Sequence, residues 1–369
     1  MKTPKEMYQE HWDRLEKAMT FQEIDRVPIR FSCDLPVAKY MGVKLADLIT
    51  DTERANTLVL MGTLLYGKGE IDSAGSGTWP PSREVGINMK LPGRDLPEDE
   101  LWQMHEQEVM VPEDYDLIIK NGWSAWKADY AKRIGDGTTP EKLKAMGPTM
   151  GRLAKNLEAV GIVSFSPVFT SAYVETFCGY RSMENFMRDL HKIPDKVQEA
   201  MDVALAEDLE NARKSIRARA KKPFAIMNGG SRSAFLSKKL FERFDLPYRM
   251  KFIDMAVEEG LFVDLHLDAN WDAKIDYFKD FPKNRCVIGL DGTSDIFRAR
   301  EILGDQIALS GDVPGSLLAL GNPDEVYNYC IKLINEVGPK GFILSTGCGA
   351  PPNSKFDNLE AMLCAVTGK

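Results

Sequence analysis

The sequence predicts an α/β fold of the (β/α)8 barrel (TIM barrel) class, formed as one domain over residues 1–369. Eight short apolar runs, many of them rich in β-branched residues, alternate with longer segments of helical periodicity. Most runs are followed by a turn rich in Gly, Asp, Asn or Ser, which is typical of βα units on a parallel sheet. A doubly wound open sheet is the alternative, but no glycine-rich nucleotide-binding motif follows any of the runs.

Each of the eight runs is a candidate strand of the barrel wall. Strands that are buried on both faces should be continuously apolar, and the segment 342–344 (Phe-Ile-Leu) fits this pattern. The candidate strands are Val27–Ser32, Glu70–Ala74, Ile162–Ser166, Phe224–Asn228, Leu261–Leu267, Cys286–Leu290, Ile307–Ser310 and Phe342–Ser345.

Two segments lie outside this regular alternation. Residues 1–26 are predicted to form a helical arm that packs either on the barrel or on a second subunit. Residues 75–150 have only short helical patterns and begin with the glycine- and proline-rich stretch Gly75–Pro81. We therefore expect an elaborated loop after the second strand rather than a separate domain.

The composition predicts a globular cytoplasmic protein. The chain is 44% hydrophobic and 28% charged, which excludes a disordered or fibrous chain, and its net charge of −8 comes without any dense Lys/Arg block. We therefore expect no nucleic-acid partner, because phosphate binding needs clustered cations. No apolar run approaches the roughly 20 residues that cross a bilayer, so neither a membrane span nor a signal peptide is expected. The six cysteines show no Cys-x-x-Cys pair, which favours reduced thiols.

The ends of the fifth and eighth strands carry metal-binding residue types. His266 and Asp268 are two residues apart on one strand, so their side chains should project together into the barrel mouth. Cys348 stands between two glycines after the eighth strand, and strand ends converge on one rim in a closed barrel. Three such ligands with an open position make a catalytic zinc site. A His–Asp hydrogen bond with an unrelated cysteine at the rim remains the alternative.

Several segments along the chain match the pattern of one known family. These segments are Asp25–Pro28, Pro167–Tyr173, Gly289–Asp291, Leu309–Val313, Gly347–Pro352 and Asn358–Met362. They resemble the uroporphyrinogen decarboxylase superfamily, and within it the corrinoid-dependent methyltransferase branch. The resemblance covers the whole chain and is weakest over residues 75–150. It implies a (β/α)8 barrel that is commonly a homodimer.

In the methyltransferase branch a His-x-Cys pair and a distant Cys in a Gly-Cys-Gly turn hold zinc. His266 and Cys348 match these positions, whereas Asp268 stands where the first cysteine would be. We expect the metal to be retained, because carboxylate is a legitimate zinc ligand, and a set with fewer thiolates suits binding to an oxygen. Decarboxylation is not expected, because the stretch Arg30–Pro36 has one arginine instead of an Arg-rich motif, and Gly75–Gly77 has no matching aspartate.

A second set of residues offers a competing metal site. Glu70, Glu84 and His105 are similar in type and nearly in spacing to the Glu, Glu and His zinc ligands of bacterial aryl-ether demethylases. The alternative interpretation is that these are three unrelated polar residues of a loop. Glu84 is kept as a candidate pocket residue, either ligand or acid.

The residues and the resemblance together predict a zinc-dependent methyltransferase. It would move a methyl group from an O-methylated (methoxyaromatic) donor to the Co(I) of a cobalamin-type corrinoid carried by a partner protein. Tyr173, which matches the decarboxylase's active-site tyrosine, and Glu84 are the candidate catalytic residues. Asn228, Tyr173 and Trp79 are the candidate substrate-binding residues. The alternatives are a methyl-corrinoid:thiol (coenzyme M-type) methyltransferase and a non-catalytic barrel that binds a corrinoid protein.

Overall fold

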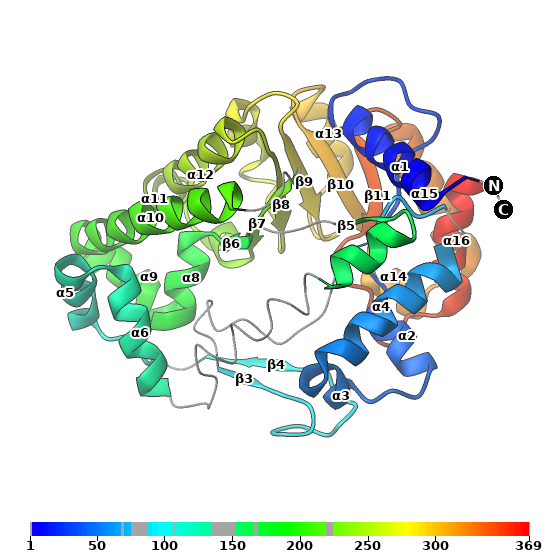
Figure 1. Cartoon of the computed structure of the whole chain (residues 1–369). Coiled ribbons are helices and arrows are strands. Elements are labelled where there is room, and N and C mark those ends of the chain that lie inside the picture. The colour runs from blue at the N-terminus through cyan, green and yellow to red at the C-terminus, as the bar shows by residue number, and fades with distance from the viewer. Residues whose placement is uncertain are drawn as a thin grey trace.

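Parallel strands form the wall of a (β/α)8 barrel in the computed structural model, with helices around it (Figure 1). The structure describes residues 2–67, 70–74, 88–106, 108–134, 152–164, 169–218 and 224–368. The wall strands are β1 (Arg30–Phe31), β2 (Ser73–Ala74), β5 (Val163–Ser164), β6 (Phe169–Ser171), β7 (Phe224–Gly230), β8 (Phe262–Leu267), β9 (Cys286–Leu290), β10 (Ala308–Val313) and β11 (Phe342–Thr346).

Hydrogen-bonded pairing arranges these strands in two parallel sheets that together form the wall. One parallel sheet runs β1-β2-β5, and the other runs from β6 through β7, β8, β9 and β10 to β11. A parallel bridge between Ile29 and Leu344 joins β1 to β11. β5 pairs with β2 and β6 pairs with β7, so the two together occupy the third position, where the sequence predicts a single strand. The predicted eight-position barrel is thereby confirmed, and β1 and β8 stand opposite each other across it.

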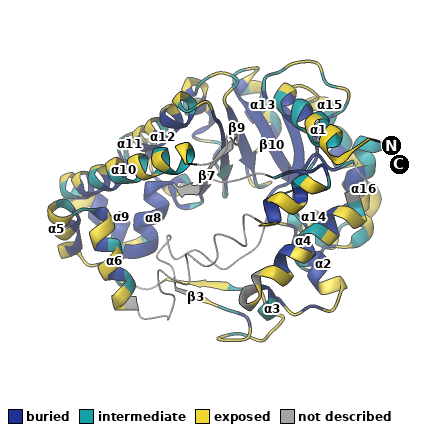
Figure 2. Ribbon diagram, viewed as in Figure 1, coloured by how far each residue is buried: buried dark blue, intermediate teal, exposed yellow. Residues whose placement is uncertain are grey.

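Helices follow most strands and form the outer layer. Figure 2 shows the wall strands β9 and β10 buried, whereas the helices expose their outer faces. Among the described residues, no helix combines the length and apolar character needed to cross a bilayer. Besides the helical residues 152–159, the outer layer contains α2 (Asp34–Tyr40), α3 (Leu45–Thr50), α4 (Thr52–Gly67), α8 (Tyr173–Arg181), α9 (Met183–Lys192), α10 (Pro194–Arg217), α11 (Lys238–Phe244), α12 (Leu246–Glu258), α13 (Ile296–Leu303), α14 (Gly315–Leu320), α15 (Pro323–Glu336), α16 (Phe356–Thr367) and the short 3-10 helices η2 (Arg232–Phe235) and η3 (Ile275–Asp280).

The predicted N-terminal helix, α1 (Pro4–Met19), closes the N-terminal end of this barrel. It begins with a capping box, in which Thr3 and Glu6 satisfy each other's backbone N–H groups. Leu15 and Met19 are fully buried and pack on residues at or near the start of five strands. Those residues are Val163, Phe262, Val287, Ala308 and Ile343. The helix therefore packs on its own barrel, which is one of the two positions that the sequence allows for it.

The described part of the loop after the second strand contains a hairpin and two helices. β3 (Asn88–Lys90) and β4 (Gln103–His105) pair antiparallel, and α5 (Pro112–Asn121) and α6 (Trp123–Ile134) follow. The Trp123 ring stacks on Trp126, with 5.2 Å between ring centroids, and its Nε1 donates to Asp208 of α10 at 3.0 Å. These contacts fix α6 against the outer helical layer.

Candidate metal centre

The structure brings His266, Asp268 and Cys348 together at the C-terminal end of the barrel. One ligand atom from each of the three lies within 4.8 Å of the other two, and they form the only such group of His, Cys, Asp and Glu in the part of the chain that the structure describes. His266 lies near the end of β8, Asp268 follows that strand, and Cys348 lies two residues beyond β11. Two strands far apart in the sequence thus supply one imidazole, one carboxylate and one thiol.

All three side chains remain accessible from the mouth. His266 and Asp268 each keep about a third of their side-chain surface exposed (33% and 34%), and Cys348 is exposed. The imidazole Nε2 lies 3.0 Å from Asp268 Oδ1. On the neighbouring strand, Gly289 pairs in register with His266, and a Cβ at Gly289 would lie 3.7 Å from the imidazole Nδ1. A Cβ at this position would therefore make only an ordinary van der Waals contact with the ring.

Backbone contacts hold the loop that carries Asp268. The carboxylate of Asp291, at the end of β9, accepts hydrogen bonds from the N–H groups of Ala269 and Thr293 at 2.8 and 2.9 Å. The Trp271 indole donates to the Asp268 carbonyl at 2.8 Å. Asp291 therefore positions the loop. The buried Asp312 instead accepts a hydrogen bond from the Tyr329 hydroxyl at 2.8 Å.

Glycine allows the close approach that places Cys348. The Gly347 N–H donates to the Val313 carbonyl at 2.9 Å, and any Cβ at Gly347 would collide with the backbone of Asp291. Beyond the cysteine, the Ala350 N–H donates to the Ser32 carbonyl at 3.3 Å, which ties the turn to the end of the first strand. The Gly-Cys-Gly turn is thus held between the first, sixth and seventh strand positions of the barrel.

The electrostatics of the group favour binding of a cation. Burial lowers the pKa of His266, but hydrogen bonds to Asp268 and Cys348 outweigh this effect and hold the pKa well above its ordinary value. Burial raises the pKa of Asp268, and its hydrogen bond to His266 reverses the direction and lowers it. The same negative surroundings that favour a proton on His266 would favour a metal ion, which would displace that proton on binding.

The other predicted site residues have different surroundings. The Tyr173 hydroxyl donates to Asp208 of α10 at 3.2 Å, so it is directed to the helical layer, and its ring is buried beside Tyr248. Asn228 pairs in backbone register with His266. Trp79 and Glu84 lie outside the described residues.

The competing Glu70, Glu84 and His105 set is described only in part. Glu70 lies 3.8 Å from Arg26, measured from Oε2 to Nε, and His105 is exposed on β4. Since Glu84 lies outside the described residues, this set stays a prediction.

Sequence reasoning missed an ion pair beneath the metal centre. Asp264 lies two residues before His266 on β8, and its Oδ2 is 2.7 Å from Nη2 of Arg30 on β1. The alternation of side chains along a strand could have placed Asp264 on the same face as His266. No signal in the sequence indicates that Arg30 reaches it from the opposite wall.

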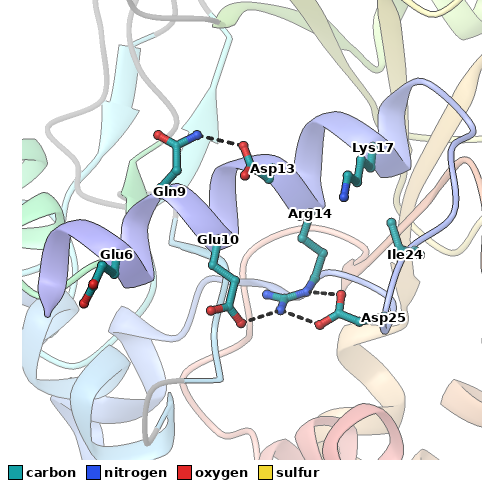
Figure 3. Close-up of a pocket in the computed structure, with 8 residues that line it drawn as sticks. All are labelled: Glu6, Gln9, Glu10, Asp13, Arg14, Lys17, Ile24 and Asp25. Atoms are coloured by element: carbon teal, nitrogen blue, oxygen red, sulfur yellow. Dashed lines mark hydrogen bonds and ion pairs between the residues drawn. The ribbon is translucent and has the colours of Figure 1, made fainter. Parts of the chain in front are cut away.

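A separate surface pocket lies beside α1, at the other end of the barrel (Figure 3). Its one buried cation, Arg14, donates to both carboxylate oxygens of Asp25 at 2.7 and 2.8 Å and to Glu10 at 3.0 Å. These carboxylates neutralise the guanidinium. The pocket therefore differs from the metal centre, where an imidazole, a carboxylate and a thiol lie close together around His266.

Comparisons with known proteins agree with the fold. The uroporphyrinogen decarboxylase (URO-D) family model matches residues 123–368, a range that contains all three metal-centre residues. Uroporphyrinogen decarboxylase from Coxiella burnetii is 32% identical over 80 residues, which cover 21% of this chain and 22% of that protein. The enzyme of the same name from Syntrophotalea carbinolica is 25% identical over 222 residues, which cover 59% of this chain and 63% of that protein.

A solved structure extends the likeness over the whole chain. The methyltransferase from Methanosarcina mazei superposes with a TM-score of 0.68, covering 99% of this chain and 98% of that one at 16% identity. At 16% identity the structural likeness shows only that the two proteins share a fold. The family assignment rests instead on the match between the URO-D family model and the sequence. The chain therefore belongs to the uroporphyrinogen decarboxylase family.

Proposed function

We propose that this protein is a zinc-dependent methyltransferase that moves a methyl group from a methoxyaromatic donor to the Co(I) of a corrinoid protein. The observation that carries the proposal is the convergence of His266, Asp268 and Cys348 at the open end of the barrel. Active sites of (β/α)8 barrels lie at this end, so the group stands where the chemistry of the fold is done.

The donor set suits zinc. Imidazole nitrogen, carboxylate oxygen and thiolate sulfur are the three ligand types that zinc takes in proteins, and a catalytic site keeps a fourth position open. His266 and Asp268 are partly exposed and Cys348 is exposed, which leaves that position on the mouth side. Zinc bound there would act as a Lewis acid, stabilising the negative charge that develops on an ether oxygen as its methyl group leaves.

An oxygen-bound substrate fits the ligand set better than a thiol does. With one thiolate, one carboxylate and one imidazole, the set is harder than a sulfur-rich site, and harder sites prefer oxygen. In the reaction the methyl carbon–oxygen bond breaks, a carbon–cobalt bond forms, and the oxygen keeps the electron pair and takes up a proton. We propose that Asn228, beside His266 in register, places this oxygen.

Relatives support the class of reaction. The Methanosarcina mazei protein, with its full-length structural likeness, is a methyltransferase by name. The sequence relatives are decarboxylases by name, but the stretch Arg30–Pro36 holds a single arginine to bind substrate carboxylates, where a decarboxylase of this family needs an Arg-rich motif.

The proposal is tested by following cobalt. The protein is mixed with a reduced corrinoid protein and a panel of methoxybenzoates and methylated amines, and the Co(I) spectrum is recorded. We expect conversion to methyl-Co(III) with a methoxyaromatic donor, and loss of that conversion in His266→Ala and Cys348→Ala. Cys364→Ala, which changes a partly exposed cysteine of α16, is the matched control and should retain it.

Other results would assign another reaction. Conversion with none of the donors would contradict the proposal. Transfer from methyl-Co(III) to a thiol would identify the other half-reaction, a methyl-corrinoid:thiol methyltransferase, and release of CO2 from uroporphyrinogen would identify a decarboxylase.

A further inference from the structure

One residue of the strand beside His266 interrupts the regular pairing of the wall. β7 and β8 pair in register as far as Asn228 and His266. Gly229 is then left over as a β-bulge before the pairing resumes at Gly230. A Cβ at Gly229 would lie 2.7 Å from the His266 carbonyl oxygen, which is closer than a real Cβ approaches another atom. The backbone of the bulge therefore packs directly on the strand that carries His266.

Arg249 of α12 binds this bulge. Its Nη2 donates to the Gly229 carbonyl at 3.0 Å. The central carbon of the same guanidinium lies 5.2 Å from the centroid of the Trp271 ring, and the Trp271 indole donates to the Asp268 carbonyl at 2.8 Å. One guanidinium thus contacts both the bulge that packs on the strand of His266 and the indole that holds the loop of Asp268.

A buried aspartate holds the guanidinium in this position. Asp245, between α11 and α12, accepts hydrogen bonds from Nε and Nη2 of Arg249 at 2.5 and 3.0 Å. Each of the two side chains keeps only 1% of its surface exposed. Nη1 of Arg249 is buried and has no hydrogen-bond partner among the described residues.

Stability alone does not account for this pair. Burying two charges costs desolvation free energy that their attraction does not reliably repay, and a buried donor without a partner adds to the cost. Apolar residues of similar volume often stabilise a core equally well or better. An apolar side chain could not, however, supply the hydrogen bond to Gly229 and the charged face against Trp271.

We propose that Arg249 is a positioning residue of the metal centre, which fixes the separation of the His266 and Asp268 side chains. Its planar guanidinium donates in its plane to Asp245 and to the bulge while its face covers the indole, and an ammonium group cannot do both. Partners that hold metal ligands in place typically contribute about 10–100-fold to metal affinity or activity. The inference rests on the metal binding of the proposed function and not on methyl transfer.

Zinc affinity tests this role without methyl transfer. Competition with a chromophoric chelator is measured for the intact protein and for Arg249→Lys, at a temperature at which both are folded. The lysine keeps a positive charge beside Asp245 but loses the fork and the flat face, so zinc should bind at least about tenfold more weakly. Arg181→Lys is the matched control, because Arg181 also pairs with a buried aspartate, Asp189, at 2.7 Å. It should bind zinc as tightly as the intact protein.

A second pair of substitutions tests the contact through the indole. Trp271→Phe keeps a ring against Arg249 but removes the donor to Asp268, so zinc binding should weaken by about three- to tenfold, the scale of one hydrogen bond. Trp123→Phe, the same substitution at a buried indole that donates to Asp208, is the control and should leave zinc binding unchanged. Arg249→Lys/Trp271→Phe should lose less than the product of the two single losses, because both substitutions act on Asp268.

Three results would overturn the positioning role. They are an unchanged zinc affinity in Arg249→Lys, an equal loss in Arg181→Lys, and losses that multiply in Arg249→Lys/Trp271→Phe. Should Arg249→Lys fail to fold, Asp245→Leu/Arg249→Met carries the same comparison, because it leaves no unpaired charge in the core.

These results are separable from those of the cobalt assay. If no donor methylates cobalt but zinc binding depends on Arg249, the positioning role holds and only the proposed reaction fails. If methyl transfer occurs and Arg249→Lys binds zinc as tightly as the intact protein, the proposed reaction holds and the positioning role fails. An intact protein that binds no zinc would overturn both.

Discussion

Asp268 is the residue on which the choice of substrate atom depends. It contacts His266 at 3.0 Å and replaces the cysteine expected at this position of a sulfur-rich set. We predict that Asp268→Cys retains zinc while ether-dependent methylation of cobalt falls at least about tenfold, because a second thiolate weakens the Lewis acid. Asp268→Ala should weaken zinc binding by at least about tenfold, the lower range for lost metal-site partners. Competition with a chromophoric chelator measures affinity. Ether cleavage by Asp268→Cys at the same rate as by the intact protein would contradict this role of Asp268.

The two glycines around Cys348 give a matched pair of substitutions. A Cβ at Gly347 would collide with the Asp291 backbone, which cannot rotate away, whereas nothing lies within 4 Å of a Cβ at Gly349. We predict that Gly347→Ala destabilises the protein by about 1–3 kcal/mol, the usual cost of overpacking, and lowers zinc affinity. Gly349→Ala should leave both unchanged. Urea unfolding and zinc titration test this pair, and similar effects of both substitutions would refute the account of the turn.

Single residues also mark the limit of inference from sequence. The alternation of side chains along a strand was enough to place His266 beside Asp268, and convergence of strand ends was enough to add Cys348. The direction of the Tyr173 hydroxyl was not predictable, because it depends on Asp208, a residue on another helix. The pairing of Arg30 with Asp264 depends on which strands face each other, which no local pattern encodes.

At the scale of an element, α2 begins with a buried carboxylate, although the ionised form of a carboxylate is more stable in water. Burial raises the pKa of Asp34, at the first position of the helix, to about 6. The unfolded chain ionises near the ordinary value, so stability should fall as pH rises from about 4 to about 6. We predict that Asp34→Asn stabilises the protein at pH 8 by up to about 3 kcal/mol, and by little at pH 4. Urea denaturation across this range measures the difference.

Asp25, in the segment after α1, provides a control of opposite sign. A hydrogen bond from Arg14 lowers the pKa of Asp25 to about 2. Its ionised form therefore favours folding above pH 4, and this contribution disappears as pH falls towards 2. Asp25→Asn should destabilise the protein at pH 7. At pH 7–8, a stability gain from Asp25→Asn would contradict the assignment of Asp25, and a stability loss from Asp34→Asn would contradict that of Asp34.

The strands were more predictable than the segments between them. β9 (Cys286–Leu290) matches its predicted range, because this fully buried parallel strand has no charged residue. β8 and β11 differ from their predicted ranges by one residue at one end. The third wall position differs more. It is divided into β5 and β6, each pairing with a different neighbour, and pairing partners are not encoded in a single run.

At the scale of the whole molecule, stability depends on α1 closing the floor of the barrel. Leu15 is fully buried among strand residues, so Leu15→Ala should cost about 2–4 kcal/mol through lost burial and the cavity that remains. Leu117→Ala, the same substitution at a 42% exposed leucine of α5, should change stability by less than about 0.5 kcal/mol. Chemical denaturation compares the two. If both substitutions lowered stability by a similarly small amount, α1 would contribute little to the core.

The central claim is that one imidazole, one carboxylate and one thiolate bind zinc at the mouth of the barrel. Zinc K-edge X-ray absorption on the purified protein tests it most directly. The account predicts one zinc per chain with a single sulfur neighbour among nitrogen and oxygen neighbours, and loss of the sulfur in Cys348→Ala. Zinc with two or more sulfur neighbours, or zinc that remains unchanged in both His266→Ala and Cys348→Ala, would contradict it.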